Sequence, residues 1–212
     1  MALWTSPRKS EAGTVGFSLE EYAKLRPTLW HFTHKANLPL IRRNPTLLCA
    51  ARFLHGNLLD EPRRGRSVRD GVPVLRDQDL LHEGSICFQS GSSMIDVVRD
   101  LNARVFFWSG WPDRPVRSGR HAFARYCASD IIFRVPFQDV AEQSPHFSRC
   151  NSGAIRKQGG KAVPRGPATF AEAEESRFDP TAVVEVTFLG CVLLPKTTDV
   201  GESLKGPWKP LR

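Results

Sequence analysis

The sequence lacks the long apolar runs and paired cysteines that mark several common protein classes. No stretch approaches the roughly 18 to 20 apolar residues that cross a bilayer, and the start lacks the apolar segment of a secretory signal. We therefore expect a cytoplasmic protein with no membrane partner. The five cysteines are odd in number, widely spaced and without a C-x-x-C pair, which argues against a disulfide framework or a zinc ribbon.

The common signatures of nucleotide and zinc binding are also missing. The chain holds no G-x-x-x-x-G-K-[ST], no G-x-G-x-x-G that opens a helix and no H-E-x-x-H. None of the six histidines has paired-ligand spacing with a nearby carboxylate. The sequence therefore predicts neither a P-loop or dinucleotide fold nor a metal site.

Positive charge is what the sequence has in excess. The 212 residues include 30 Lys and Arg against 22 Asp and Glu, a formal net charge of +8. The excess is concentrated in residues 99–125 and in residues 149–165, and the second stretch contains no acidic residue. Clustered positive charge attracts polyanions, so we expect nucleic acid or a phosphate-bearing cofactor as partner. A solvated basic surface without a partner is the alternative at this stage.

Short helical and strand patterns alternate along the chain after a loose arm at residues 1–16. Helices are predicted near 18–25, 35–43, 92–101 and 119–128, and strands at 29–33, 86–88, 105–108, 131–135, 182–188 and 191–194. Residues 60–79 are predicted as an exposed loop or irregular hairpin, with an edge strand at 72–75. Residues 144–169 show no periodicity, and a structureless stretch of that length is more often functional than a simple connection. This order predicts one α+β domain over residues 17–212, with the last two strands joined by a tight turn.

The first candidate functional pattern is His31-Phe32-Thr33-His34, at the end of a predicted strand that leads directly into a helix. Alternation places His31 and Thr33 on the same face of the strand. An imidazole and a hydroxyl that converge on one point can hold a ribose. The alternative is that His31 is a core histidine beneath Trp30.

The second candidate is Glu185, in the middle of a predicted strand rich in β-branched residues. A carboxylate there is disfavoured unless it faces solvent or a functional cleft, because burial of an unpaired charge is costly. Both environments remain open for Glu185 on the sequence alone.

The third candidate is the loop that begins at Arg149 and continues through a basic, glycine-rich run. Small hydrogen-bonding side chains, glycine and clustered positive charge suit contact with phosphates or nucleic acid. The residues expected to make this contact are Arg149, Asn151, Ser152, Arg156 and Lys157. A flexible basic loop without a ligand is the alternative.

The segment Leu29-Trp30-His31-Phe32-Thr33-His34-Lys35-Ala36-Asn37-Leu38-Pro39-Leu40-Ile41 resembles the opening motif of the DarT-type ADP-ribosyltransferases. In that motif an aromatic residue, His, an apolar residue and Thr end a strand, and an Asn-Leu-x-x-Ile helix follows. The order of later motifs is similar, with a serine segment opening a helix, here Ser92-Ser93-Met94, and a glutamate on a late strand, here Glu185. The chain also looks like an uncharacterised bacterial group that shares the Asn-Ser-Gly loop and the Val-Val-Glu-Val strand.

This resemblance implies an ADP-ribosyltransferase-like fold, a split mixed or antiparallel β-sheet with short flanking helices, and NAD as co-substrate. It implies catalysis by Glu185 and an arginine, for which Arg52 lies at a suitable distance and Arg42 is the rival. The residues expected to bind NAD are His31, Thr33, Asn37, Phe88, Ser93 and Phe107. The implied reaction is transfer of ADP-ribose to a DNA or RNA base by a toxin or defence effector, with an antitoxin or hydrolase as a further partner.

Two other functions stay open on the sequence. An NAD-using RNA 2′-phosphotransferase-like enzyme would need a set of phosphate-binding Arg and His residues that cannot be aligned here. A non-catalytic nucleic-acid-binding module would need only the basic surface, with His31 and Glu185 in structural roles. The transferase, by contrast, requires His31, Thr33 and Glu185 to share one cleft.

Overall fold

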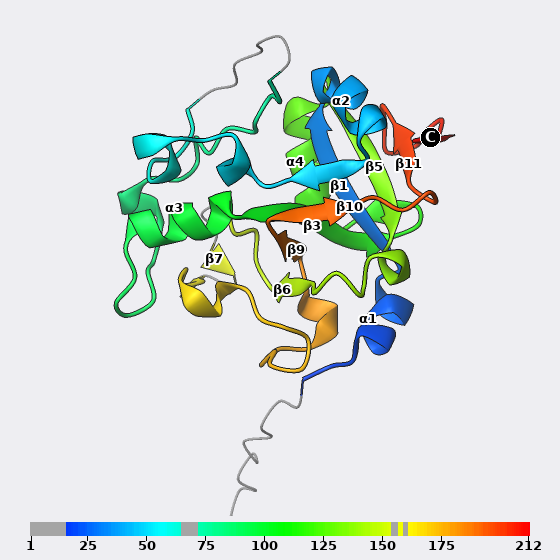
Figure 1. Cartoon of the computed structure of the whole chain (residues 1–212). Coiled ribbons are helices and arrows are strands. Elements are labelled where there is room, and N and C mark those ends of the chain that lie inside the picture. Colours follow the sequence, from blue (N-terminus) through cyan, green and yellow to red (C-terminus); the bar gives the residue numbers. More distant parts are fainter. Residues whose placement is uncertain (1–15, 65–71, 154–156, 159–160) are drawn as a thin grey trace, which may run out of the picture.

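The computed structural model of the chain describes residues 16–64, 72–153, 157–158 and 161–212 (Figure 1). The expected N-terminal arm therefore lies almost wholly outside the described residues, and so does Arg156. Lys157 belongs to a described strand, but its side chain is not described.

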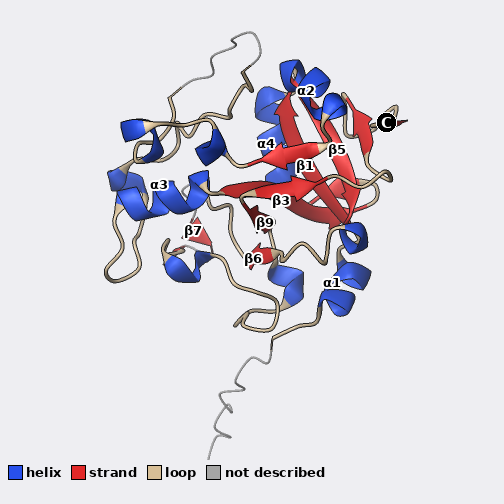
Figure 2. Cartoon of the chain, in the orientation of Figure 1, coloured by secondary structure: helices blue, strands red, loops and turns tan. Residues whose placement is uncertain are grey.

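An antiparallel sheet of eight strands occupies the centre of the molecule and short helices surround it (Figure 2). The strand order is β12-β11-β5-β1-β3-β9-β6, and β4 pairs with β3. Their bounds are β1 Thr28–His34, β3 Arg104–Trp111, β4 Arg114–Pro115, β5 Asp130–Pro136, β6 His146–Ser148, β9 Glu185–Leu189, β11 Asp199–Gly201 and β12 Lys209–Pro210. Two small ribbons pair β2 (Thr46–Leu48) with β10 (Cys191–Leu193) and β7 (Lys157–Gln158) with β8 (Lys161–Ala162). The α+β class and the mostly antiparallel sheet predicted from the sequence are confirmed.

Two of the four described α-helices begin at capping residues that the sequence indicates. The four helices are α1 Leu19–Leu25, α2 Leu38–Arg43, α3 Met94–Asn102 and α4 Arg117–Tyr126. Ser18 with Glu21, and Ser93 with Asp96, form capping boxes that satisfy the free N–H groups of the first turns of α1 and α3. The short 3₁₀ turns are η1 Lys35–Asn37, η2 Ala50–Arg52, η3 Gly56–Leu59, η4 Glu83–Ser85, η5 Phe137–Asp139, η6 Pro167–Thr169 and η7 Pro180–Ala182. No helix in the described part of the chain is long and apolar enough to cross a membrane.

The sheet forks between β1 and β3. Thr28, Leu29 and Trp30 pair with Gly110, Ser109 and Trp108, and the ladder between the two strands ends there. From His31 to His34, β1 pairs with β5 only, and from Arg104 to Phe107, β3 pairs with β9 only. The His31 side chain bridges the opening, because its Nδ1 donates to the carbonyl oxygen of Phe106 at 2.8 Å.

The two faces of the sheet are covered by separate apolar clusters. The larger cluster joins Leu29, Phe107 and Val186 of the sheet to Tyr22 of α1. The smaller cluster joins Trp30, Phe32, Trp108 and Ile132 to Phe123 of α4. Alternation along each strand explains this division, since neighbouring residues point to opposite faces.

Glycine at position 119 lets α4 approach the sheet closely. A Cβ at Gly119 would lie 2.8 Å from Trp108 Cγ and 2.9 Å from Trp108 Cβ. The position of Trp108 Cβ is set by the backbone of β3, so a different rotamer of Trp108 does not remove the clash with a larger residue. Gly119 therefore fixes the distance between α4 and β3.

Several predicted strands differ from those observed. Residues 86–88 form no strand, and Phe88 makes only an isolated bridge to Arg165. The strand predicted at 182–188 begins at Glu185, because η7 ends at Ala182 and the chain enters the sheet after two further residues. β10 pairs with β2 and not with β9. Only Gly190, at φ +73°, separates β9 from β10, which is too short for the two-residue loop of a tight hairpin.

Candidate functional site

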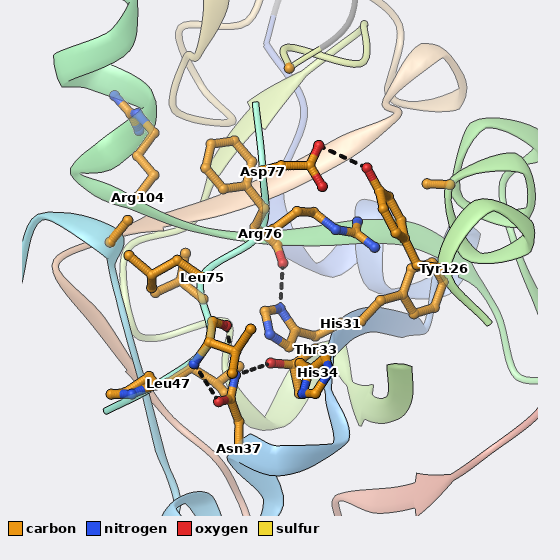
Figure 3. Close-up of a pocket in the computed structure, with 18 of the residues that line it drawn as sticks. His31, Thr33, His34, Asn37, Leu47, Leu75, Arg76, Asp77, Arg104 and Tyr126 are labelled. Atoms are coloured by element: carbon orange, nitrogen blue, oxygen red, sulfur yellow. Dashed lines mark hydrogen bonds between the residues drawn. The ribbon is translucent and has the colours of Figure 1, made fainter. Parts of the chain in front are cut away.

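A pocket of about 820 Å³ opens in the fork of the sheet (Figure 3). Its walls include residues 31–34 of β1, residues 104–106 of β3, residues 73–80 and part of α4. Consecutive residues of β1 and of β3 reach it because the strands have separated, so both faces of each strand border the same space. The volume lies in the range of roughly 300 to 1,000 Å³ that is usual for small-molecule sites.

His31 lines this pocket as a neutral imidazole. Because a carbonyl oxygen only accepts hydrogen bonds, the contact with Phe106 requires the proton on Nδ1 and leaves Nε2 as an acceptor. Burial, with a smaller contribution from the nearby Arg76, lowers the pKa of His31 to about 4 against the opposing effect of the hydrogen bond to Phe106. No described residue hydrogen-bonds to Nε2. His31 therefore offers the pocket an acceptor that suits a ligand hydroxyl.

Thr33 and Asn37 line the same pocket and hold part of its wall. Asn37 Nδ2 donates to Thr33 Oγ1 at 2.9 Å and to the Val74 carbonyl at 3.0 Å, and Asn37 Oδ1 accepts from the Val74 N–H at 2.7 Å. The buried amide of Asn37 thus fixes the chain at Val74 to the start of α2. Asn37, expected to bind NAD, acts here chiefly as a clamp.

Glu185 stands at the start of β9 and its carboxylate faces the pocket from the sheet face that carries Trp108, its cross-strand neighbour. The side chain is only 4% exposed, and Oε2 accepts from Ser152 N at 2.9 Å and from Ser152 Oγ at 2.6 Å. Burial raises the pKa of Glu185 to about 7, against the opposing effect of the two Ser152 hydrogen bonds. A carboxyl group with that pKa can exchange a proton near neutral pH.

A buried arginine holds the loop around Ser152 through hydrogen bonds to its backbone carbonyls. Arg165 donates from Nη2 to the Asn151 carbonyl at 2.9 Å and from Nε to the Ser152 carbonyl at 3.3 Å. Of the loop residues predicted to bind nucleic acid, Asn151 and Ser152 line the pocket, whereas Arg149 is exposed outside it. The loop is therefore part of the pocket wall.

A segment over residues 73–79 closes the open side of the fork. Arg76 pairs with Asp130 at 2.9 Å, and its guanidinium lies 4.7 Å from the centre of the Tyr126 ring. Tyr126 donates to Asp77 at 2.8 Å, so the segment is joined to α4 (Figure 3). Arg63 adds a hydrogen bond from Nε to the Arg76 carbonyl at 2.8 Å.

Sequence reasoning missed this segment because its many charged residues were interpreted as an exposed loop. The pocket residues not predicted include Arg63, Arg76, Asp77, Arg104 and Tyr126. The available signal was the apolar sequence Val72-Pro73-Val74-Leu75, of which Val74 is buried. That signal indicates burial but not the partner.

Several residues predicted for the site lie elsewhere. Arg52 is exposed on η2 and does not line the pocket, because η2 turns its side chain outward, and Arg42 is exposed on α2 and lies outside the pocket as well. Ser93 is engaged in capping α3. Phe88 and Phe107 pack in apolar clusters on either side of the sheet. Arg52, Ser93, Phe88 and Phe107 therefore occupy surface, capping and core positions outside this pocket.

The charge of the pocket favours an anionic ligand. Its described lining includes five arginines and three carboxylates. The arginines are Arg43, Arg63, Arg76, Arg104 and Arg125. Within the described residues, no group of three or more His, Cys, Asp or Glu side chains is placed to hold a metal ion.

Comparison with known proteins adds a family but no activity. No curated protein matches the sequence. A family model covers residues 27–193, a range that contains every residue of the pocket wall. The chain belongs to that family, a family of unknown function (DUF7002).

Proposed function

We propose that this protein is an NAD-dependent mono-ADP-ribosyltransferase that modifies a nucleic-acid base. The observation that carries the proposal is that His31, Thr33 and Glu185 line one pocket. They come from β1 and β9, on opposite sides of the fork. A non-catalytic module has no need of this convergence.

The residues of the pocket suit the parts of NAD. The Nε2 acceptor of His31 and the hydroxyl of Thr33 match ribose hydroxyl groups. The arginines of the wall match a pyrophosphate. Arg76 and Arg104 replace Arg52 as candidates for that contact, since both line the pocket.

Glu185 is the proposed catalytic group. Transfer breaks the bond between C1′ of the ribose and nicotinamide, and the sugar develops positive charge, as in glycoside cleavage. The ionised carboxylate stabilises that charge. The acceptor base forms the new bond to C1′ and loses a proton, which Glu185 accepts. A pKa of about 7 leaves a large fraction of Glu185 in the required basic form at neutral pH.

The alternative function is a non-catalytic nucleic-acid-binding module. The observation that favours it is that Ser152 already satisfies one oxygen of Glu185 with two hydrogen bonds. A buried structural carboxylate would show the same contacts. The two functions differ in whether NAD is consumed.

The deciding experiment incubates the protein with NAD labelled in the adenylate phosphate and with single-stranded DNA, duplex DNA or RNA. We expect label on one nucleic acid, and a loss of roughly 10²- to 10⁴-fold in Glu185→Gln, because a general base contributes about that factor. Glu142→Gln, at an exposed position, is the matched control and keeps full transfer. Transfer retained in Glu185→Gln, or NAD that remains intact with every acceptor, would contradict the proposal.

A further inference from the structure

The helix α4 carries a row of exposed basic side chains next to the pocket. Arg117, Arg120, His121 and Arg125 are all exposed. Spacings of three, four and eight residues place them on one face of the helix, and at 1.5 Å per residue the row is about 12 Å long. The opposite face holds Phe123 against the sheet.

Like Arg42, Arg149 and Arg177, the α4 arginines are exposed without a carboxylate partner among the described residues. Five other described arginines each pair with an aspartate, namely Arg76, Arg99, Arg104, Arg114 and Arg134. In the part of the chain that the structure describes, no carboxylate forms an ion pair with the three α4 arginines, and α4 itself contains no acidic residue. Their charge is therefore available to an external anion.

The basic row is continuous with the pocket. His121 and Arg125 line the pocket wall as well as the exposed face, and Tyr126 follows on the same helix. The Arg125 guanidinium lies 5.2 Å from the centre of the Tyr126 ring. A charged row that ends at an aromatic ring is typical of sites for single-stranded nucleic acid, where phosphates and bases are bound by different groups.

The loop at 149–165 is expected from its charge to bind nucleic acid. Its described side chains, however, are less suited to contact phosphates than those of α4. Arg165 is 4% exposed and its guanidinium is engaged with carbonyl groups of the loop. Buried in this way, Arg165 cannot reach a phosphate. Among the loop side chains that the structure describes, Arg149 is the exposed cation.

We propose that the exposed face of α4, through Arg117, Arg120 and Arg125, binds the phosphates of single-stranded nucleic acid and directs a base to the pocket. The inference deepens the proposed function, because it names the surface that holds the acceptor. A single strand fits better than a duplex, since a base within a duplex cannot enter a pocket without being flipped out.

The test measures binding of a fluorescent single-stranded oligonucleotide by anisotropy at several salt concentrations, in the absence of NAD. The variant Arg117→Gln/Arg120→Gln removes two cations that do not line the pocket. The matched control is Arg42→Gln/Arg177→Gln, which removes two exposed cations elsewhere and gives the same net charge. Arg149→Gln examines the loop separately.

We expect the α4 variant to bind roughly tenfold more weakly at 0.1 M salt, with the salt slope reduced by about 0.7 for each phosphate that the variant no longer neutralises. The matched control and Arg149→Gln should bind like the unmodified protein. Equal weakening in the α4 variant and the control would overturn the proposal, because it would show that only net charge matters. Loss of binding in Arg149→Gln alone would assign the phosphate-binding surface to the loop.

A further experiment distinguishes nucleic acid from an anionic membrane as the partner, and the design keeps binding separate from enzymatic activity. Cosedimentation with vesicles of phosphatidylserine and phosphatidylcholine, without oligonucleotide binding, would overturn the proposal in favour of a membrane surface. Because the assay contains no NAD, absence of transferase activity leaves its result unaffected. Failure of this inference is therefore distinguishable from failure of the proposed function.

Discussion

Burial pushes both His31 and Glu185, two titratable side chains that line the pocket, toward their neutral forms. The pKa of His31 is lowered to about 4 and the pKa of Glu185 is raised to about 7, in each case mainly by desolvation. The histidine is therefore fixed in one protonation state at physiological pH, whereas the glutamate is poised between two. Only the glutamate can respond to small changes in its surroundings.

This difference predicts how Glu185 affects stability. Between its ordinary pKa of 4.5 and about 7, the folded protein binds more protons at this site than the unfolded chain, so the free energy of unfolding falls as pH rises. We expect the difference between wild type and Glu185→Gln to change by about 3 kcal/mol from pH 4.5 to pH 8 in urea denaturation. Glu142→Gln should follow the wild-type curve. Parallel curves for wild type and Glu185→Gln would show that the carboxyl is solvated.

The state of His31 is also measurable. In a ¹H–¹⁵N NMR titration of the imidazoles, we expect the His31 signals to keep the neutral, Nδ1-protonated pattern down to about pH 5 and to titrate near 4. The spectrum of His31→Gln identifies these signals by their loss. A midpoint near the ordinary value of 6.5 would mean that the ring is exposed and the Phe106 contact is not formed.

At the scale of elements, the wall over residues 73–79 depends on one amide side chain. Asn37→Ala leaves the Val74 N–H and carbonyl without their buried partner. We expect a loss of roughly 2 to 4 kcal/mol in the free energy of unfolding, and faster hydrogen exchange at Val74. Asn57→Ala, at an exposed asparagine, is the control and should change neither. Unchanged exchange at Val74 in Asn37→Ala would show that the segment is held by other contacts.

The seating of α4 leads to another prediction at this scale. Gly119→Ala improves helix propensity by about 1 kcal/mol, yet places a methyl group against the base of Trp108. We expect the steric effect to dominate, with a net loss of about 1 to 3 kcal/mol in thermal or chemical denaturation. Ala124→Gly on the exposed face measures the propensity effect alone, about 1 kcal/mol. A stabilised Gly119→Ala would mean that α4 lies further from β3.

Local patterns in the sequence predict the elements better than their pairing. The capping residues Ser18 and Ser93 mark the starts of α1 and α3, because capping depends on neighbours three residues apart. The partner of β10 could not be predicted, since the apolar pattern of Cys191–Leu193 suits any strand edge. The same limit applies to β11 and β12, which are too short to show periodicity.

The residues of the candidate site also fall into two groups, those that a local sequence pattern predicts and those that only the fold brings together. His31, Thr33 and Glu185 are predictable from the sequence, because each is a polar residue within an apolar strand pattern. All three line the pocket. Arg52 was placed by distance along the chain, which does not determine where a side chain points in space. The arginines that do reach the pocket come from segments that are remote in sequence and lack any periodic pattern.

At the scale of the whole molecule, the C-terminal residues complete a fold that the family match covers only to residue 193. β11 pairs with β5, and Val200 and Leu211 are buried in the larger core. We expect removal of residues 195–212 to abolish the cooperative thermal transition seen by circular dichroism. Lys209→Ala, at an exposed position of β12, should leave the transition unchanged. A cooperative transition in the truncated protein would show that residues 27–193 fold without this cover.

Because of the fork, β1 and β3 are paired over only part of their length, and this junction is the seam between the two halves of the sheet. The backbone ladder between β1 and β3 consists of three residue pairs, whereas β1 and β5 share seven. One half of the sheet carries His31 and the other carries Glu185. A molecule that touches both residues therefore ties the two halves together, and its binding energy adds to the resistance of the seam against opening.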